Sequence, residues 1–569
     1  MKKYLLLLFL FPFQILAQST IIKNVNVLDI ETNKVIKNTA VGMANGKITA
    51  IQNFDKFSVS DSDKVIDGEG RFLSPGLIDA HIHFFQSGGL YTRPDGLDLR
   101  EIVPYQEEID FAKNNASDYM KRYLRNGITT VADVGGPMWN FEVRDSIAKN
   151  MTSPNVLVTG PLFSMVSRPK LDLGDPPIIQ VQTKEDVLAL FNKQLPYKPD
   201  FIKIWYVVSP QSPAEKTYPL VEYLAQLCRE NNLKLAVHAT ELATAQLAVK
   251  AGANILVHSI DNTIIPNEFI KELKEKDITY IPTLIVSKGY IKAFTGQIDF
   301  TSDDLKWANP MAFNTLLDPK KIPKDKWPYA LQALYGTEIP PVYDQLDSIM
   351  LENLSNLSEA KINIVTGTDA GNIGTMHASS FMTELTMMQK AGLSNWQLLT
   401  YSSLNAAKGF GRGEEMGSIK VGKLADMILL DKNPIEDIQN LKSISLVIKS
   451  GEILEPKRIL VETPAQIVQR QVNAYNARDI DAFVNTYSED VEIYDENGRL
   501  SLKGRDQMRV SYTGLFEGVP DLYCEIANRI VINNKVIDKE IVRANGSIIK
   551  AVAIYEVENG KITKVSFIE

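Results

Sequence analysis

The sequence predicts an α/β protein built around a closed (β/α)8 TIM barrel. Eight short apolar runs alternate with amphipathic stretches, which is the pattern of βαβ units and a parallel sheet. Four of the five histidines stand at or near the ends of these runs, where active sites of such barrels form. The expected strands are 77–84, 127–134, 155–160, 201–207, 234–240, 255–260, 279–286 and 363–370.

Length and composition indicate a multidomain globular protein. The chain has 569 residues, 44% of them hydrophobic and 23% charged, so at least two folding units are expected. The formal charge is −8, and losing Lys2 and Lys3 with a leader would make it −8 − 2 = −10. This charge argues against nucleic acid and anionic lipid as partners. With only Cys228 and Cys524, we expect no disulfide framework.

Residues 1–17 are expected to be a signal peptide. Lys2 and Lys3 precede an apolar stretch from Tyr4 to Leu16, and small Ala17 follows, which is the order of a secretory signal. The stretch of about 13 apolar residues is shorter than the roughly 20 that span a bilayer. We therefore expect cleavage after Ala17, no membrane span and a periplasmic or secreted protein.

Further domains flank the predicted barrel at 74–409. Short β-branched runs broken by polar turns occupy 18–73 and return at 410–457, which indicates one small sheet domain built from both segments. Residues 462–569 contain two helical patterns followed by strands, enough for a separate unit. The connection from 287 to about 345 is too long for a plain loop. It is expected to form a lid or a pocket wall.

Metal-ligating residue types gather at the predicted strand ends. His81 and His83 are separated by one residue on a strand, so both imidazoles project from one face and can bind one ion. Alone, this spacing is weak evidence, and each histidine taken singly could be an ordinary buried side chain. Their order around the barrel makes the set strong. The remaining members close the fifth, sixth and eighth strands and are His238, His258 and Asp369.

Lys203 stands in an apolar run on the fourth strand. A buried ammonium is costly unless it is paired or neutral. A neutral amine can react with carbon dioxide, and the resulting carbamate can bridge two cations as a carboxylate would. The alternative is a structural salt bridge with Asp200 or Asp133.

Several segments together resemble the amidohydrolase superfamily over about 21–454. They are Leu73-Ser-Pro-Gly-Leu-Ile-Asp-Ala-His-Ile-His, the strand-ending histidines, Gly367-Thr-Asp-Ala-Gly and Gly417-Ser-Ile-Lys-Val-Gly-Lys-Leu-Ala-Asp. Asp200-Phe-Ile-Lys-Ile is similar to the branch of prolidase-like and imidazolonepropionase-related metal-dependent hydrolases. The resemblance implies a (β/α)8 barrel with a flanking β-sandwich and two divalent metal ions, usually zinc.

The resemblance also implies a role for each candidate ligand. His81, His83 and Asp369 would hold the more buried metal, His238 and His258 the second, and carboxylated Lys203 would bridge both. A hydroxide bridging the metals would be the nucleophile. Asp369 would act as general base and then as general acid, which gives Asp369 and Lys203 catalytic roles.

The expected substrate is a small molecule with an amide, a cyclic amide or a related carbon–nitrogen bond. Gly160-Pro-Leu-Phe-Ser-Met lacks the histidine of peptidase-like members, which argues against a dipeptide. His377 could contact substrate or serve loop structure, and Arg168 and Lys170 could meet an anionic group or be solvated. The alternatives are a lactone or phosphotriester hydrolase with the same centre, and a non-catalytic metal-containing protein that binds a ligand.

The C-terminal unit resembles the SnoaL-like α+β cone. The resemblance rests on Tyr487-Ser-Glu-Asp-Val-Glu-Ile-Tyr, Leu502-Lys-Gly-Arg and Ile554-Tyr-Glu-Val-Glu-Asn-Gly-Lys-Ile. Tyr494, Asp495 and Asp538 could line its pocket, although surface or cap roles are the simpler interpretation. The resemblance implies a ligand-binding appendage or a homodimer formed through its sheet.

Overall fold

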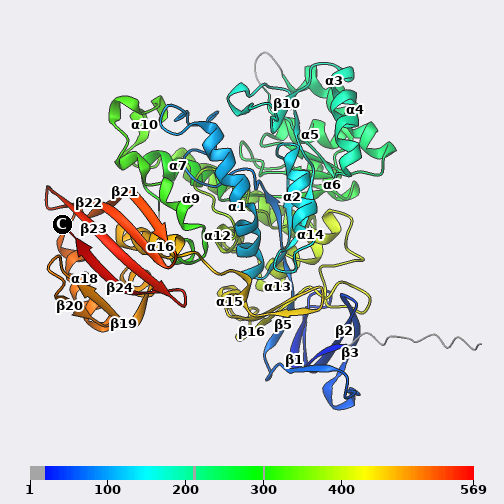
Figure 1. Cartoon of the computed structure of the whole chain (residues 1–569). Coiled ribbons are helices and arrows are strands. Elements are labelled where there is room, and N and C mark those ends of the chain that lie inside the picture. The colour runs from blue at the N-terminus through cyan, green and yellow to red at the C-terminus, as the bar shows by residue number, and fades with distance from the viewer. Residues whose placement is uncertain (1–18, 209–212, 299–300, 569) are drawn as a thin grey trace, which may run out of the picture.

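The structure, a computed structural model, describes residues 19–208, 213–298 and 301–568. The predicted signal peptide at 1–17 lies outside these ranges. In Figure 1 a central α/β body is flanked by an N-terminal sheet, drawn in blue, and a C-terminal domain, drawn in orange and red. Among the described residues, no helix is both long and apolar enough to cross a membrane.

The central body contains two sheets of parallel strands. One has the order β6 (Leu77–Ile82), β7 (Ile128–Asp133) and β8 (Asn155–Val158). The other has the order β10 (Ile178–Gln180), β9 (Leu162–Ser164), β11 (Ile202–Trp205), β12 (Leu235–His238), β13 (Ile255–Val257), β14 (Thr279–Ile281) and β15 (Asn363–Ile364). All eight predicted strands are present, and each is shorter than expected.

Backbone hydrogen bonds join the seven-stranded sheet to both edges of the three-stranded sheet. At its β6 edge the amide of Asp369 donates to the carbonyl of His81 over 2.8 Å, and Ala80 donates to Thr366 over 2.9 Å. At its β8 edge the amide of Asp200, which precedes β11, donates to the carbonyl of Val158 over 2.9 Å. The sheets therefore share strand neighbours although they are separate hydrogen-bonded ladders.

The third predicted strand is interrupted at Gly160. This glycine has φ +81, and Pro161, which follows it, has no amide hydrogen for a ladder. The chain therefore leaves β8 at Val158 and resumes in β9 and β10, two short strands that the sequence analysis did not anticipate.

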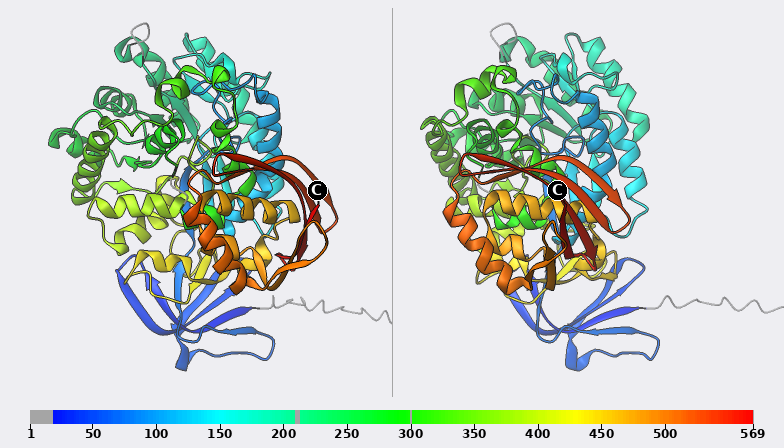
Figure 2. Two further views of the ribbon diagram at one scale, coloured as in Figure 1. Left: turned by 90° about the vertical axis from the view of Figure 1, so that its left-hand side faces the viewer. Right: turned by 60° about the vertical axis from the view of Figure 1, so that its left-hand side comes forward.

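Helices follow most of these strands and lie against the sheets (Figures 1 and 2). In α4, Val221, Leu224 and Cys228 are buried, at the spacing of one helical face. The helices of the body are α1 (Tyr105–Arg125), α2 (Trp139–Ile147), α3 (Lys184–Gln194), α4 (Ala214–Glu230), α5 (Leu242–Ala251), α6 (Asn267–Glu275), α11 (Val342–Glu359), α12 (Ser380–Lys390), α13 (Asn395–Tyr401) and α14 (Leu404–Gly409).

The long connection between β14 and β15 is helical. It contains α7 (Val286–Thr295), α8 (Ser302–Trp307), α9 (Pro310–Thr315) and α10 (Tyr329–Leu334). Phe313 and Trp327 pack with Leu90 and Leu97, which follow β6. This apolar cluster joins the connection to the first loop of the body, so both segments form one wall beside the strand ends.

The N-terminal and 410–457 segments meet in one sheet, as predicted. Its order is β18 (Glu452–Leu454), β17 (Ile444–Lys449), β16 (Met427–Leu430), β5 (Phe72–Pro75), β1 (Thr20–Asp29), β2 (Lys34–Ala44) and β3 (Lys47–Asn53), with β4 (Lys64–Asp67) paired to β1. Antiparallel pairing of β5 with β16 joins the two segments. All eight strands belong to a single hydrogen-bonded sheet, in which β1 pairs with β2, β4 and β5. The β-sandwich that the resemblance implied stays a prediction.

The C-terminal domain has its own sheet, helices and apolar core. The strand order is β20 (Leu500–Lys503), β19 (Tyr487–Tyr494), β24 (Lys561–Ile568), β23 (Ser547–Glu558), β22 (Lys535–Ala544) and β21 (Tyr523–Ile532). The helices are α16 (Pro464–Ala477), α17 (Ile480–Val484) and α18 (Arg505–Gly518). Val468, Phe483 and Met508 join the sheet residues in one core.

A buried ion-pair network fastens this domain to the central body. Arg122 of α1 is fully buried and donates to Asp118 over 2.6 Å and to Glu462 over 2.9 Å. Glu462 also accepts from Arg470 of α16 over 3.0 Å. Burial alone would raise the pKa of Glu462, but Arg470 and Arg122 outweigh it and lower this pKa to about 2. The carboxylate therefore stays ionised between two guanidinium groups.

Replacing Arg122 by leucine is expected to weaken the whole molecule. The change leaves Asp118 and Glu462 short of a buried partner, and breaking such a pair costs about 3 kcal/mol or more. Urea unfolding followed by fluorescence measures the loss in the first transition. Lys535→Met, which breaks the surface pair with Glu556, is the control and should cost below about 1 kcal/mol. Equal losses in both variants would contradict the structural role of Arg122.

Candidate metal centre

All six predicted ligands line one cavity of about 260 Å³ at the carboxyl ends of the parallel strands. They come from β6, β11 and β12 and from the residues that follow β6, β13 and β15. All six are largely buried. They are His81, His83, Lys203, His238, His258 and Asp369. The structure therefore brings together side chains that lie up to 288 positions apart (369 − 81).

His81, His83 and Asp369 form the tightest part of the cluster. The Nε2 atoms of His81 and His83 are 3.2 Å apart, and each lies 3.2 Å from Oδ1 of Asp369. Nδ1 of His83 lies 2.7 Å from the carbonyl oxygen of Gly135. That carbonyl can only accept, so Nδ1 donates the proton and Nε2 keeps its lone pair toward the cavity.

The second pair of histidines lies against the first. The ring of His258 is 5.0 Å from that of His81 and 4.3 Å from that of His238, measured between centroids. Nδ1 of His258 is 3.8 Å from Oδ2 of Asp369 and 2.8 Å from Oγ1 of Thr283. The two oxygens of Asp369 therefore face different histidines.

Two of the cluster residues have left-handed backbone conformations. His258 has φ 75 and Asp369 has φ 59, values that are rare for side chains other than glycine. Each stands just after a strand, where the turn aims its side chain across the cavity instead of along the sheet. Such conformations persist where the surroundings enforce them, and they concentrate at functional sites.

Burial sets the protonation state that coordination requires. It lowers the pKa of His81 to about 4 and those of His238 and His258 well below their usual range. Burial alone would raise the pKa of Asp369, but the neighbouring histidines outweigh it and hold this pKa well below its usual range. At pH 7 the imidazoles of His81, His238 and His258 are therefore neutral and the carboxylate of Asp369 is ionised, which are the forms that bind metals.

Lys203 is buried and burial lowers its pKa to about 7, partly offset by the charge of Asp369. Neither carboxylate of the alternative salt bridge pairs with it within the described chain. Asp200 pairs with Arg412 at 3.3 Å, and Asp133 accepts from the amides of Phe84 and Gly135. A substantial fraction of this lysine is therefore a neutral amine at pH 7, the form that reacts with carbon dioxide.

The donor set fits divalent cations. Ligand atoms of His81, His258 and Asp369 all lie within 4.8 Å of one another. Nδ1 of His81 is buried without a hydrogen-bond partner among the described residues, which is costly for a group that is not otherwise used. Neutral imidazoles with a carboxylate suit zinc and related metals.

Residues that the sequence analysis missed position Asp369. Nδ2 of Asn372 donates to Oδ1 of Asp369 over 2.7 Å. Oδ1 of Asn372 accepts from Arg93 over 2.9 Å and from the hydroxyl of Tyr290 over 2.7 Å. Asp95 holds Arg93 through two hydrogen bonds of 2.8 and 2.7 Å. Asn372 stands three residues after Asp369, so a role beside that carboxylate could have been suspected from the sequence. No motif in the sequence marks Arg93 or Tyr290.

Arg168 lies beside the cavity and Lys170 is paired elsewhere. The guanidinium of Arg168 stands 4.7 Å from the ring centroid of Trp205, a residue that lines the cavity. Its Nε is 3.5 Å from Asp95. Nζ of Lys170 lies 3.0 Å from Asp98. Arg168 can therefore meet a ligand that rests on Trp205.

His377 is packed inside the protein and does not line this cavity. Its Nε2 lies 2.8 Å from the carbonyl of Gln86, and its Nδ1 lies 3.1 Å from the hydroxyl of Tyr123. Its ring stacks on Tyr119 at 4.4 Å. With both nitrogens used by the protein, this placement favours the structural alternative over a substrate contact.

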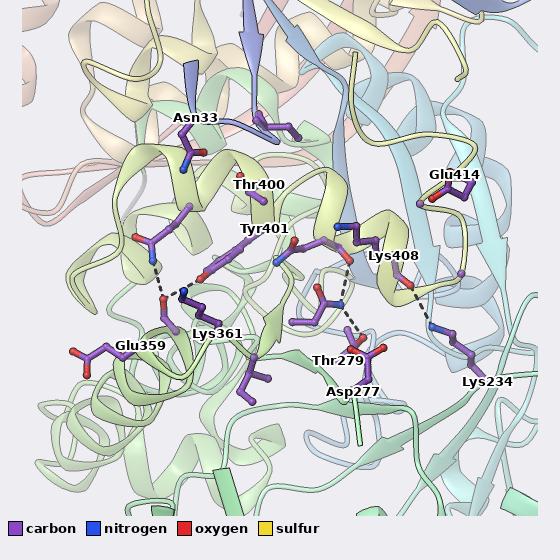
Figure 3. A pocket seen from close by; sticks show the side chains of 18 residues that line it. Asn33, Lys234, Asp277, Thr279, Glu359, Lys361, Thr400, Tyr401, Lys408 and Glu414 are labelled. Carbon is purple, nitrogen blue, oxygen red and sulfur yellow. Dashed lines mark hydrogen bonds between the residues drawn. The ribbon is translucent and has the colours of Figure 1, made fainter. Parts of the chain in front are cut away.

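A larger cavity of about 980 Å³ lies at the opposite end of the strands and lacks these ligands (Figure 3). Lys234 there donates to the carbonyl of Gly409 over 2.8 Å, and Asn363 donates to Thr279 over 2.9 Å. These polar side chains are already hydrogen-bonded within the protein, so the larger volume alone does not make this cavity the active site.

Residues 72–454, more than half of the chain, match the sequence model of the amidohydrolase family. The chain belongs to the amidohydrolase family. Residues 468–565 match the model of a SnoaL-like domain. The predicted resemblances, and the prediction of an amidohydrolase-family enzyme, are thereby confirmed.

Relatives and solved structures agree with this family. A 5-methylthioadenosine/S-adenosylhomocysteine deaminase of Thermococcus kodakarensis is 26% identical over 44% of this chain, which spans only 57% of that relative. An imidazolonepropionase of Thermoplasma volcanium is 22% identical over 74% of this chain and 91% of its own. A Xaa-Pro dipeptidase structure, 21% identical, covers 77% of this chain and all of its own with a TM-score of 0.59. This last likeness shows the fold.

His377→Gln is expected to destabilise the protein more at neutral than at acid pH. Burial lowers the pKa of His377 to about 4, whereas the unfolded chain has a value near 6.5. Between pH 4 and pH 6.5, His377 is protonated in the unfolded state and neutral in the folded state. Its contribution to the free energy of unfolding is therefore full above pH 6.5 and declines as pH falls toward 4. The decline is at most about 1.4 kcal/mol per pH unit.

Urea unfolding of both proteins at pH 7.5, 6 and 5 measures this difference. A difference that does not change with pH would contradict a buried neutral histidine. A raised KM with unchanged stability would instead place His377 against the substrate.

Proposed function

We propose that this chain is an exported, binuclear metal-dependent amidohydrolase that cleaves an amide, a cyclic amide or a related carbon–nitrogen bond. The observation that carries the proposal is the convergence of all six ligand-type side chains on one buried cavity. Membership of the amidohydrolase family supports it. We include in the proposal that the two parallel sheets act as one closed (β/α)8 barrel, which the hydrogen bonds at both of their edges support.

His81, His83 and Asp369 would hold one ion, and His238 and His258 the other. Lys203, as its carbamate, would bridge both. The 3.2 Å separations around Oδ1 of Asp369 support the first group, and the 4.3 Å contact between the rings of His238 and His258 supports the second. The lowered pKa of Lys203, about 7, supplies the neutral amine that carboxylation requires.

When bound, the two cations lower the pKa of a shared water toward neutrality and polarise the scissile carbonyl. Asp369 receives the proton of the attacking water on Oδ2, since Oδ1 already accepts from Asn372. It then delivers this proton to the leaving nitrogen, as general base and afterwards as general acid. Asn372 keeps the carboxylate oriented for both steps.

The substrate is proposed to carry an anionic group. Arg93 and Arg168 both lie against the carboxylate of Asp95, so two guanidinium groups stand together beside the cavity. Trp205 beside Arg168 offers an apolar surface for the rest of the molecule. Lactones and phosphotriesters would use the same centre, so they belong in any substrate panel.

Export and pairing of two copies are part of the proposal. Exposed Ile530 and Ile532 on the edge strand β21 support pairing through the C-terminal sheet, which light scattering tests. For export, we expect expression in a secreting bacterial host to yield mature protein outside the cytoplasm that begins at Gln18. N-terminal sequencing of that fraction checks this, and retention of Met1 in the exported protein would contradict it.

Lys203→Ala is expected to lose activity and metal together. Without the carbamate the two cations lose their shared anionic ligand, so metal content should fall from two to one or fewer per chain. kcat should drop at least about 100-fold, the upper part of the range for losing an outer-shell partner. Elemental analysis and a panel of amides, lactams, lactones and phosphotriesters measure both effects.

Propionate supplies a free carboxylate and should partly restore the activity of Lys203→Ala. Lys234→Ala, which changes a lysine at the opposite end of the strands, is the matched control and should keep its metal. If Lys203→Ala retained both metals and full activity, the bridging role would be refuted. Loaded wild-type protein that hydrolyses nothing in the panel would favour the non-catalytic alternative.

A further inference from the structure

A cavity of about 410 Å³ lies where the connection between β14 and β15 meets the C-terminal domain (Figure 1). Its walls come from residues 319–335 of the connection and, in the C-terminal domain, from Arg478, residues 520–523 and Arg543. We call it the interdomain cleft. It shares no lining residue with the metal centre or with the separate cavity inside the C-terminal domain. Its volume lies within the range of sites for small molecules, and nothing in the proposed hydrolysis uses it.

Basic side chains dominate the interdomain cleft. One acidic residue, Asp521, lines it, and four basic residues do so, namely Lys320, Lys324, Arg478 and Arg543. The local balance is 4 − 1 = +3, although the formal charge of the whole chain is −8. Asp521 accepts from the backbone amides of the 545–546 turn over 2.6 and 2.7 Å. The neighbouring acids Asp318 and Glu525 are not part of the lining. Among the described residues, none of the four cations forms an ion pair with a carboxylate.

Three of these cations gather around Tyr523, which is 6% exposed. Nζ of Lys320 lies 5.1 Å and Cζ of Arg543 lies 6.0 Å from the centroid of its ring. Burial lowers the pKa of Lys320, and the charges of Arg478 and Arg543 lower it further. The three cations therefore repel one another, and an anion between them relieves this cost.

Backbone carbonyls hold the two guanidinium groups in place. Arg478 caps the end of α16 in a left-handed conformation, with φ 58, and donates to the carbonyl of Pro520. Arg543 donates to the carbonyl of Lys320 over 3.4 Å, a bond that crosses from the C-terminal domain to the connection. Within the described chain each guanidinium makes only this hydrogen bond, so most of its five donors remain available. The two groups are thus oriented before a ligand arrives, which reduces the entropy lost on binding.

We propose that the interdomain cleft binds a small polyanion with two or more carboxylate or phosphate groups. These groups lie between Lys320, Arg478 and Arg543 and accept charge-assisted hydrogen bonds from them. Trp327 and Tyr523 provide the apolar part of the wall. The ligand contacts the connection and the C-terminal domain at once, so binding stabilises their contact. The site does not depend on the proposed hydrolysis and shares none of its residues.

Calorimetric titration of the full-length protein tests the proposal. The probes are trimesate, a benzenetricarboxylate, and fructose bisphosphate, with benzoate as the singly charged control. We expect saturable binding of either polyanion, with an affinity at least about tenfold higher than that for benzoate, because additional charge-assisted hydrogen bonds separate them. The affinity should fall as sodium chloride is raised, since Lys320 and Arg543 are exposed to solvent. A preference between the two probes assigns the ligand to carboxylates or to phosphates.

Lys320→Met and Arg543→Met should each lower the affinity for trimesate about tenfold, since each removes one cation from the cleft. Lys539→Met is the matched control and should bind as the wild type does, because Lys539 is exposed on the same strand as Arg543 and lies outside the cleft. Arg168→Met, beside the metal centre, should also leave this binding unchanged.

Thermal melting gives an independent readout of the same binding. Trimesate should raise the melting temperature of the wild type and of Lys539→Met, and it should not raise that of the double variant Lys320→Met/Arg543→Met. The proposal is overturned if the wild type binds neither polyanion saturably. It is equally overturned if both single variants in the cleft bind trimesate with wild-type affinity, or if Arg168→Met abolishes the binding.

Discussion

The carboxylate of Asp369 connects the sheets, the ligands and the loops around the cavity. Its amide joins the end of the last strand to the first strand at His81, and its two oxygens face three histidines. Next to it, Thr368 donates to Asp79 over 2.7 Å. Asp79, the acid of the first-strand motif, thus fixes the two strands against each other instead of acting as a ligand. These contacts together fix the position of the Asp369 carboxylate.

The surroundings of this carboxylate impose one protonation pattern. Burial lowers the pKa of His81 and of Lys203, while the neighbouring histidines hold the pKa of Asp369 well below its usual range. The same low-polarity interior strengthens every remaining electrostatic interaction. The site is therefore organised before any substrate enters, and the left-handed turns at His258 and Asp369 are stabilised by the packing around them.

That these six residues would meet in one cavity was predictable from sequence, because strand ends are local features. His81 and His83 share a face by the two-residue period of a strand, and apolar runs located His238 and His258. The partners that orient them were not predictable, since Gly135 and Arg93 reach the site from loops and Tyr290 from helix α7, whose positions depend on distant packing. The burial of His377 was not predictable for the same reason. Tyr119 and Tyr123 of α1 enclose it, and they lie more than 250 residues away in the sequence. The predicted third strand, 155–160, stopped before Pro161, which cannot continue a ladder. The short strands β9 and β10 that follow were not predicted, because they have only three residues each.

Helix α16 belongs to two environments at once. Gln471 and Tyr475 face the cavity of the C-terminal domain, while Arg470 donates to the carbonyl of Ala308 and Asn473 to that of Pro310 in the connection beside the metal centre. Helix α16 thus contacts both the C-terminal domain and the connection beside the metal centre. A substitution that keeps one set of contacts must also keep the other. The C-terminal domain therefore depends on residues 308–310 for its placement. Transferring this domain to another amidohydrolase would require that segment as well.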